Sequence, residues 1–196
     1  MTNLLTLLET VTRCLDKGDS VDTGIIFLDF AKAFDKVPHK RLLRKLENHG
    51  IGGKLWQWIE SWLEGRLQRT CIKGIRSSWR KVTSGVPQGS VLGPILFLIY
   101  INDLDSGVMS WILKFADDTK IYRRVGDSDE RRQLQHDLDK LISWSKEWQM
   151  LFNDKKCRVM HIGDGEQHVY RMGNHDIENI DVEKDLGVML SSDRKM

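Results

Sequence analysis

Hydrophobic positions along the chain follow two spacings, one typical of helices and one typical of strands. Apolar residues recur at intervals of three and four in several segments, as on one face of an amphipathic helix. These segments are residues 3–17, 38–50, 53–64 and 128–149. The nearly continuous apolar stretch 91–104 predicts a further helix, which leads out of a loop at residues 84–89. The first helix is expected to end near Gly18.

Short runs rich in β-branched and aromatic residues predict strands. The clearest runs are residues 24–29, 111–115, 119–122 and 158–162, with weaker signals at 168–172 and 186–190. Residues 66–83 alternate loosely and predict strands around a turn at Ser77-Ser78. The pair Asp117-Asp118 lies between two of the clear strands, so a hairpin is expected there.

The order of these elements between residues 23 and 162 is strand, helices, two hairpin strands, helix and strand. This is the β-α-β-β-α-β arrangement of ferredoxin-like domains, and it predicts an α+β fold. In that topology the first strand and the hairpin lie side by side in the middle of the sheet. Asp29, at the end of the first strand, is therefore expected beside Asp117 and Asp118 at the hairpin tip.

Composition is that of an ordinary globular protein, with 196 residues, 40% hydrophobic and 30% charged. The longest apolar run, residues 91–101, is too short to cross a bilayer, which needs about 20 apolar residues, and no membrane partner is expected. The three cysteines are far apart and form no C-x-x-C pair, which predicts a reducing, intracellular setting without a disulfide-linked partner. Nothing in the sequence decides between nucleus and cytoplasm.

Charge is unevenly distributed along the chain. The segment from Lys36 to Lys81 contains 12 Lys or Arg and 3 Glu, a local balance of +9 against a net charge of +2. The remainder therefore carries −7. Such asymmetry suits a protein that contacts a polyanion in one place and binds cations in another. A solvated surface is the alternative interpretation, and charge alone slightly favours it.

The three aspartates have ordinary explanations when each is taken alone. An Asp-Asp pair is common in tight turns, and an aspartate that ends a strand often caps the next helix. The predicted topology changes this balance, because carboxylates brought together repel one another unless cations neutralise them. Mg²⁺ prefers oxygen ligands, and a pair of such ions stabilises the attacking and leaving oxygens of an in-line phosphoryl displacement. The cluster therefore predicts a two-metal site for a phosphoryl displacement.

Four segments resemble the successive palm motifs of reverse transcriptases. They are FLDFAKAFDKVPHKRLL (27–43), SGVPQGSVLGPILFLIYINDL (84–104), KFADDTKIY (114–122) and FNDKKCRVMHIG (152–163). The likeness is greatest to retrotransposons without long terminal repeats, of the jockey-like kind. The resemblance implies an RNA-directed DNA polymerase with a polymerase palm fold, which adds dNTPs to a DNA primer on an RNA template. It also implies two Mg²⁺ ions, with Mn²⁺ as a substitute.

The same resemblance assigns roles to single residues. Asp29, Asp117 and Asp118 match the catalytic, metal-binding acids, and the backbone carbonyl of Phe30 is a further oxygen ligand. Phe34 matches the bulky residue under the incoming sugar that excludes a 2′-hydroxyl; core packing is its alternative explanation.

Further matches concern the incoming nucleotide and its phosphates. Gln88 and Gly89 resemble the loop that contacts nucleotide and template, for which an ordinary strand-to-helix loop is the alternative. Lys156 matches a lysine near the departing pyrophosphate, where it could serve as general acid, and Lys155 is a rival for that role.

A basic group on one helix suits template or primer phosphates, although a solvated helix face explains it equally well. This group consists of Lys40, Arg41, Arg44 and Lys45, which are expected opposite the apolar face.

The domain expected over residues 1–196 is a truncated reverse transcriptase, a palm with partial fingers. Upstream fingers motifs, a thumb and an endonuclease have no counterpart in the sequence. Two competing hypotheses follow. One is a non-catalytic remnant that at most binds nucleic acid. The other is the related polymerase of group II introns, for which a maturase segment would be expected.

Overall fold

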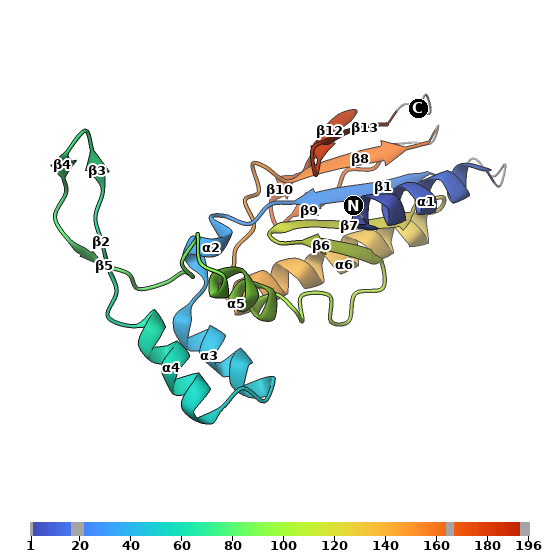
Figure 1. Ribbon diagram of the computed structural model, residues 1–196. Helices are drawn as coiled ribbons and strands as arrows, with labels where there is room; N and C mark the ends of the chain where they lie inside the picture. The colour runs from blue at the N-terminus through green and yellow to red at the C-terminus, as the bar shows by residue number, and fades with distance from the viewer. Residues whose placement is uncertain (1, 17–21, 164–166, 193–196) are drawn as a thin grey trace. The chain divides into compact units, whose positions relative to one another are not determined.

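The computed structural model describes residues 2–16, 22–163 and 167–192 (Figure 1). The chain divides into two compact units. The first consists of residues 1–31, 105–146 and 151–196, and the second of residues 32–104 and 147–150. The predicted end of the first helix at Gly18 lies outside the described residues.

The first unit is built on a five-stranded sheet with the strand order β11-β8-β1-β7-β6. The strands are β1 (Thr23–Leu28), β6 (Trp111–Phe115), β7 (Asp118–Arg124), β8 (Arg158–Ile162) and β11 (Glu178–Asn179). β1 is antiparallel to both β7 and β8, and β7 is antiparallel to β6. The order of β8, β1, β7 and β6 confirms the ferredoxin-like arrangement and the α+β fold class.

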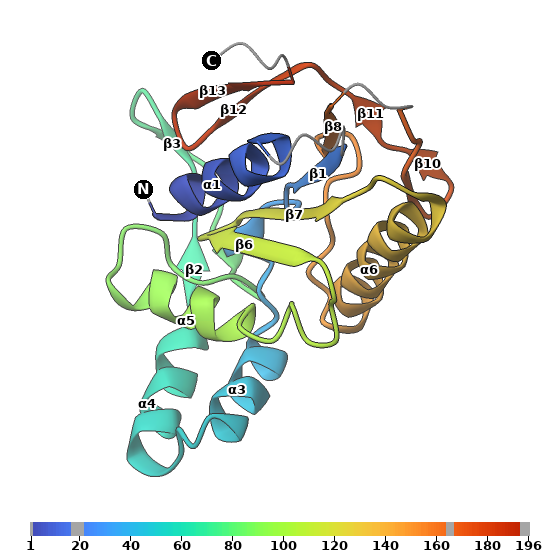
Figure 2. The same ribbon diagram turned by 90° about the vertical axis from the view of Figure 1, so that its right-hand side faces the viewer.

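Helices α1 (Thr2–Asp16) and α6 (Ser128–Glu147) cover opposite faces of this sheet (Figures 1 and 2). Side chains alternate between the faces along each strand. Ile25 of β1 belongs to a buried cluster with Leu4 and Leu7 of α1. The neighbouring Gly24 faces α6, where an added Cβ would lie 3.0 Å from Leu134. Residues of β1 with the parity of Ile25 therefore point to the α1 side.

Two small hairpins follow β8 in the first unit. They are β9 (Arg171–Met172) with β10 (His175–Asp176), and β12 (Val182–Asp185) with β13 (Val188–Ser191). Leu190 of β13 joins the buried cluster beneath α1. The weak strand signals at 168–172 and 186–190 thus correspond to parts of β9 and β13.

The second unit is mainly helical. Its helices are α2 (Ala33–Lys36), α3 (His39–Asn48), α4 (Gly53–Leu63) and α5 (Leu92–Tyr100). Pro38 directly precedes α3, where its missing N–H costs no hydrogen bond. The one-turn α2 was not anticipated, and α5 ends earlier than residue 104. No helix in the described ranges is long and apolar enough to cross a membrane.

A two-stranded ribbon connects α4 to the loop before α5. It contains β2 (Leu67–Gln68), β3 (Cys71–Ile72), β4 (Ile75–Arg76) and β5 (Arg80–Lys81). The prediction of a turn at Ser77-Ser78 is wrong, because the ribbon turns at Lys73-Gly74, with φ of 48° and 83°. Two residues with positive φ suit the tight hairpin turn that matches strand twist. The N–H of Ser77 instead donates to the carbonyl of Thr70.

The expectation that Lys45 lies on a solvated face of α3 is also wrong. Its side chain is only 2% exposed, and its Nζ forms an ion pair with Asp103. Nζ also donates to the Tyr100 carbonyl and lies 3.8 Å from the centre of the Trp148 ring. A lysine stem packs readily among apolar groups when its ammonium finds partners. Lys45 therefore stabilises the interior of the second unit.

Candidate active site

Asp29 and Asp118 face each other across two neighbouring strands in the first unit. The register pairs Leu28 with Thr119, so the next position along β1, Asp29, lies opposite Asp118. Asp29 shares the parity of Ile25 and therefore points to the α1 side of the sheet. The structure thus brings together two acids that are far apart in the sequence, as the predicted topology required.

Asp117 occupies the tip of the hairpin between β6 and β7. The last pair of this hairpin joins Phe115 to Asp118, which leaves Ala116 and Asp117 as the loop. Ala116 has a φ of 53°, a left-handed conformation that costs a residue with a Cβ roughly 1–2 kcal/mol. Backbone strain of this kind concentrates at functional sites, where surrounding structure maintains it.

Lys156 is the second neighbour of Asp29. The pairing of β1 with β8 ends at Phe27 and Arg158, and Lys156 lies in the turn of residues 154–156 that leads into β8. The Nζ of Lys156 lies 3.2 Å from Oδ2 of Asp29. Lys155 lines another cavity, with Asp154 and Arg158. Of the two lysines, only Lys156 therefore contacts an acid of the candidate site.

The backbone around Asp29 is held firmly by the segment before β8. The N–H of Asn153 donates to the Asp29 carbonyl over 2.7 Å, and the N–H of Ala31 donates to the Leu151 carbonyl over 2.8 Å. Between these bonds the buried ring of Phe30 stacks on Phe152, with ring centres 4.5 Å apart. Backbone hydrogen bonds at Asp29 and at Ala31 therefore hold the main chain before and after Phe30.

A buried ion pair that the sequence did not reveal adjoins these acids. Lys120, two residues after Asp118 on β7, pairs with Asp185 of β12, and their side chains are 3% and 6% exposed. Both line a cavity of about 120 Å³ together with Asp29, Asp118 and Lys156. Nothing in the spacing of Asp185 distinguishes it from other acids near the C-terminus, so sequence reasoning had no signal for it.

The electrostatics of the cavity favour added positive charge. Partial burial raises the pKa of Asp118 above its usual 3.8, and the carboxylates of Asp117, Asp185 and Asp29 raise it further, while Lys120 opposes them. Carboxylate oxygens are the ligands that Mg²⁺ prefers, so the donors fit a divalent cation. Across the described ranges, however, no three His, Cys, Asp or Glu side chains are grouped as a metal-ligand set. Mg²⁺ is commonly held by one or two carboxylates plus substrate phosphates, which matches what the cavity offers.

The second unit contains three of the residues predicted to contact the nucleotide, Phe34, Gln88 and Gly89, and hydrogen bonds join the two segments that carry them. The N–H of Gly85 donates to the Val37 carbonyl, and the N–H of Val86 donates to the Phe34 carbonyl. Gly85 has a φ of +89°, and a Cβ there would lie 2.7 Å from the carbonyl oxygen of Asp35. Only glycine fits this close approach. The loop 84–90 is thus fastened to the segment that carries Phe34.

Phe34 and Gln88 lie at this junction. The half-buried ring of Phe34 stacks on Phe97 of α5, with ring centres 4.5 Å apart, so the packing explanation holds for one side of the ring. Gln88 is exposed, and its Nε2 lies 3.4 Å from Oδ1 of Asp35. Gln88 and Asp35 both line a polar cavity of about 840 Å³. Gly89, beside Gln88, has a φ of +81°.

Two further residues that sequence reasoning missed hold the same loop. Nη2 of Arg66 donates to the Gly85 carbonyl over 2.9 Å, and Nε2 of His39 lies 2.9 Å from the same oxygen. Of the basic residues predicted on α3, Lys40 and Arg44 are exposed and Arg41 is half-buried. These three side chains can reach the phosphates of a nucleic acid, whereas the buried Lys45 cannot.

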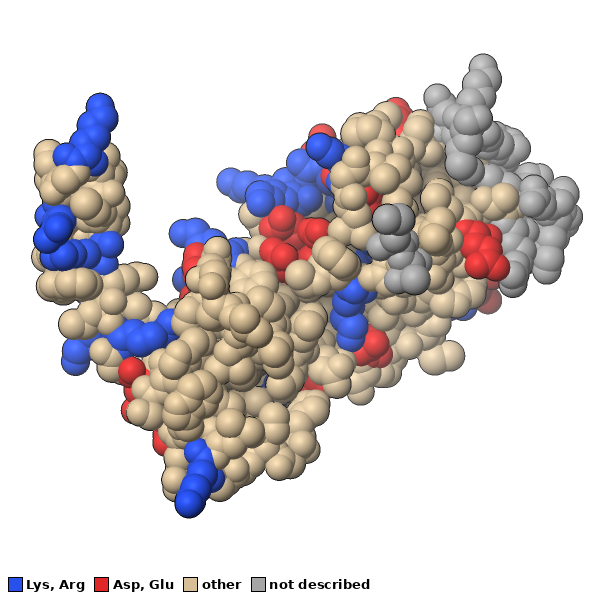
Figure 3. Space-filling model, viewed as in Figure 1, with Lys and Arg blue, Asp and Glu red and all other residues tan. Residues whose placement is uncertain are grey.

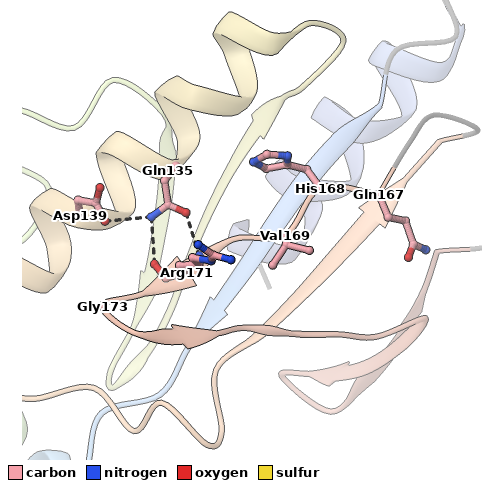
Figure 4. Close-up of a pocket in the computed structure, with 7 residues that line it drawn as sticks. All are labelled: Gln135, Asp139, Gln167, His168, Val169, Arg171 and Gly173. Atoms are coloured by element: carbon pink, nitrogen blue, oxygen red, sulfur yellow. Dashed lines mark hydrogen bonds between the residues drawn. The ribbon is translucent and has the colours of Figure 1, made fainter.

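A second cavity in the first unit, larger than the one beside Asp29, contains none of the predicted site residues (Figure 4). It has a volume of about 670 Å³ and lies between α6 and the segment leading into β9. Gln135 of α6 accepts from the Arg171 N–H over 2.9 Å and donates to the Arg171 carbonyl over 3.0 Å. The Gln135 side-chain amide thus bonds both backbone groups of Arg171, as a neighbouring strand would, and links β9 to α6.

Comparison with known proteins extends these observations. The family model described as reverse transcriptase (RNA-dependent DNA polymerase) matches residues 3–186. The chain is 36% identical over 143 residues to the RNA-directed DNA polymerase from mobile element jockey of Drosophila funebris, covering 68% of this chain and 16% of that protein. It is 32% identical over 142 residues to the corresponding Drosophila melanogaster protein, covering 67% and 15%. The chain thus spans about one sixth of the length of these relatives.

Solved structures agree on the fold. A telomerase chain from Candida tropicalis superposes with a TM-score of 0.54 at 14% identity, covering 87% of this chain and 32% of the telomerase chain. At that identity the likeness concerns the fold alone. It supports the assignment of the α+β core as a polymerase palm.

Proposed function

The chain belongs to the reverse transcriptase family, and on that premise we propose that it acts as the palm of an RNA-directed DNA polymerase from a non-LTR retrotransposon. Its partners in this function are an RNA template, a DNA primer and dNTPs. The oxygen of the primer 3′-hydroxyl attacks the α-phosphate of the dNTP. The hydroxyl loses its proton to solvent and a phosphodiester bond forms to the α-phosphorus. The bond between the α-phosphorus and the oxygen that bridges to the β-phosphate breaks, and pyrophosphate leaves with that oxygen.

The observation that carries this proposal is the cross-strand position of Asp29 and Asp118, with Asp117 at the adjoining hairpin tip. Asp118 is the first residue of β7, Asp29 directly follows β1 on the neighbouring strand, and Asp117 lies in the turn just before Asp118. Sites on strands hold their geometry better than sites on loops. Burial first and the neighbouring acids second raise the pKa of Asp118, and this concentration of negative charge supports a role in binding cations.

In this proposal Asp29, Asp117 and Asp118, with the Phe30 carbonyl, hold two Mg²⁺ ions, for which Mn²⁺ can substitute. Such ions, when bound, supply electrostatic stabilisation of the attacking and leaving oxygens. Lys156 has two tasks. Its ammonium balances Asp29 when no nucleotide is present, as the 3.2 Å contact indicates. During the reaction it donates a proton to the leaving pyrophosphate.

The second unit supplies recognition of the nucleotide and of nucleic-acid phosphates. Phe34 lies beneath the sugar and excludes a 2′-hydroxyl, while Gln88 and Gly89 contact the base pair being formed. Lys40, Arg41 and Arg44 contact template or primer phosphates. The hydrogen bonds between the loop 84–90 and the Phe34 segment support joint action by Phe34 and Gln88.

The test is dNTP incorporation by the purified chain on an RNA template with a DNA primer, at several Mg²⁺ and Mn²⁺ concentrations. The matched control is Asp117→Ala/Asp118→Ala, with folding of both proteins checked by circular dichroism. Synthesis by the parent chain and its loss in the double variant would support the proposal. Metal-dependent synthesis that survives the double substitution would show that the acids are misassigned. A folded chain that binds primer–template but never extends it would be a non-catalytic remnant.

A further inference from the structure

The ribbon of residues 67–81, called here the basic ribbon, has an unusual composition for a two-stranded element. It contains five cations, Arg69, Lys73, Arg76, Arg80 and Lys81, and no Asp or Glu. Every one of its residues is exposed. In Figure 3 the ribbon shows blue side chains on tan with no red.

The basic ribbon also exposes large apolar side chains. Ile72 and Ile75 form a cross-strand pair beside the tip and are 65% and 79% exposed. Trp79 is 57% exposed, and the guanidinium of Arg69 stacks over its ring at 4.2 Å. This arrangement leaves part of the indole ring open to solvent.

Such a ribbon is poorly stabilised by itself. A two-stranded hairpin that packs against nothing is marginal in water, and like charges on it repel one another. In the described part of the chain none of its five cations forms an ion pair. This positive charge therefore suits binding of a polyanion from outside the chain. The exposed part of the Trp79 ring suits stacking on a flat apolar group.

We propose that the basic ribbon is a binding surface for a single-stranded nucleic acid, with its cations on the phosphates and Trp79 stacked on an unpaired base. Proteins that bind single strands combine a basic track with aromatic rings on which bases stack. Duplex nucleic acid meets the charge requirement but has no free base face to offer Trp79. The identity of the partner rests on the proposed function, whereas the binding needs none of the chemistry at Asp29.

The test measures binding of the full chain to fluorescein-labelled oligonucleotides by anisotropy, across a range of KCl concentrations. The probes are single-stranded RNA, single-stranded DNA and duplexes of the same length. The ribbon variant is Lys73→Gln/Arg76→Gln/Arg80→Gln. The charge-matched control is Lys54→Gln/Arg132→Gln/Lys146→Gln, which removes three exposed cations from α4 and α6. Circular dichroism verifies folding.

The ribbon variant should bind single strands about tenfold or more weakly at 0.1 M salt, because phosphate contacts dominate affinity. Its slope of log affinity against log salt should fall by roughly 2, about 0.7 for each cation lost. Trp79→Ala should weaken single-strand binding about fivefold or more and leave duplex binding nearly unchanged. The control variant should differ from the parent by less than about threefold.

Several outcomes would overturn the proposal. Equal losses in the ribbon and control variants would make the attraction a general effect of charge. Indifference of single-strand binding to Trp79→Ala would assign the ribbon to a duplex backbone instead. A parent chain that binds no strand would indicate that the ribbon packs on protein. Ribbon-dependent binding without dNTP incorporation would refute the proposed function alone, and incorporation with ribbon-independent binding would refute this inference alone.

Discussion

The Nζ of Lys156 lies 3.2 Å from Oδ2 of Asp29, so the ammonium of a lysine in the turn before β8 balances the charge of the acid that follows β1. A metal ion that binds Asp29 must compete with this ammonium. Both side chains are substantially exposed, at 64% and 38%, so their pairing adds little to stability. The contact is therefore expected to affect the proposed cation binding at Asp29 more than folding.

Replacing Lys156 by Met should change metal binding and catalysis in opposite directions. Mn²⁺ affinity of the substrate-free chain, followed by electron paramagnetic resonance, should rise a few-fold because the competing charge is gone. The rate of dNTP incorporation should fall on the order of 10²-fold if Lys156 is the general acid. Lys155→Met is the control and should alter neither quantity. A loss of rate in Lys155→Met alone would transfer the role to Lys155.

The ion pair of Lys120 with Asp185 should be costly to break from one side. Asp185→Asn leaves a buried ammonium without its counter-ion, and the free energy of unfolding should fall by about 3–5 kcal/mol. The double variant Lys120→Met/Asp185→Leu should regain most of that loss, because neither charge then remains buried. Urea unfolding of the parent and variants measures both effects. If the double variant lost as much free energy of unfolding as the two single variants together, the pairing of Lys120 with Asp185 would be contradicted.

Gly85 and Gly89 offer a matched pair of backbone tests. Their φ values are +89° and +81°, but only Gly85 has backbone within 4 Å of the Cβ position. Gly89→Ala should therefore cost only the strain of a left-handed alanine, about 1 kcal/mol. Gly85→Ala adds a collision with Asp35 and should cost about 3 kcal/mol or more. Equal losses in thermal or urea unfolding would mean that the close approach at Gly85 is unimportant.

Phe34→Ala should relax sugar discrimination. Removing the ring opens space for a 2′-hydroxyl, and ribonucleotide incorporation relative to deoxynucleotide should rise on the order of 10- to 100-fold. The variant also loses the stack on Phe97, so its stability should fall by at least about 1 kcal/mol. Phe34→Leu keeps bulk and serves as the control, with discrimination largely retained. Unchanged discrimination in Phe34→Ala would leave the ring with a packing role only.

His161 should make stability depend on pH. Burial lowers the pKa of its imidazole below the usual 6.5, although a hydrogen bond to the His168 carbonyl partly opposes this. The folded state thus favours the neutral ring. Its contribution is fully present above pH 6.5 and is lost as the pH falls through the lowered pKa. His161→Phe should show a smaller drop in urea midpoint between pH 7.5 and 5.5 than the parent. Identical drops would exclude His161 as the titrating group.

Sequence reasoning was most successful where pattern and topology agreed. The period-2 and period-3.6 runs gave the strands and helices of the first unit, and their order then fixed the neighbours of β1. Asp29 and Asp118 came together for that reason alone. Their roles in binding metal and nucleotides remain predictions, since no ligand contact tests them.

Sequence reasoning was weakest where a side chain acts across the fold. Lys45 has the helical position of a surface residue, yet Asp103, Tyr100 and Trp148 meet it from distant segments. Arg66 and His39 converge on one carbonyl oxygen that no spacing could reveal. The ribbon turn was misplaced because Lys73-Gly74 looked less turn-like than two adjacent serines. The contacts of Lys45, Arg66 and His39 depend on partners remote in the chain, whereas the misplaced turn is a local error.

The placement of Asp29 on the α1 face has a genetic consequence. Its face is determined by whether an even or odd number of residues separates it from the positions that pair within β1. Loss of a single codon inside β1 would turn Asp29 toward α6 and away from Asp118. Such an in-frame deletion would separate Asp29 from Asp118, and under the proposed function it should abolish synthesis as replacing the acid would. Loss of two codons would preserve the face and displace the carboxylate along the strand by roughly 7 Å. Copies of this gene should therefore tolerate substitutions in β1 far better than changes in its length.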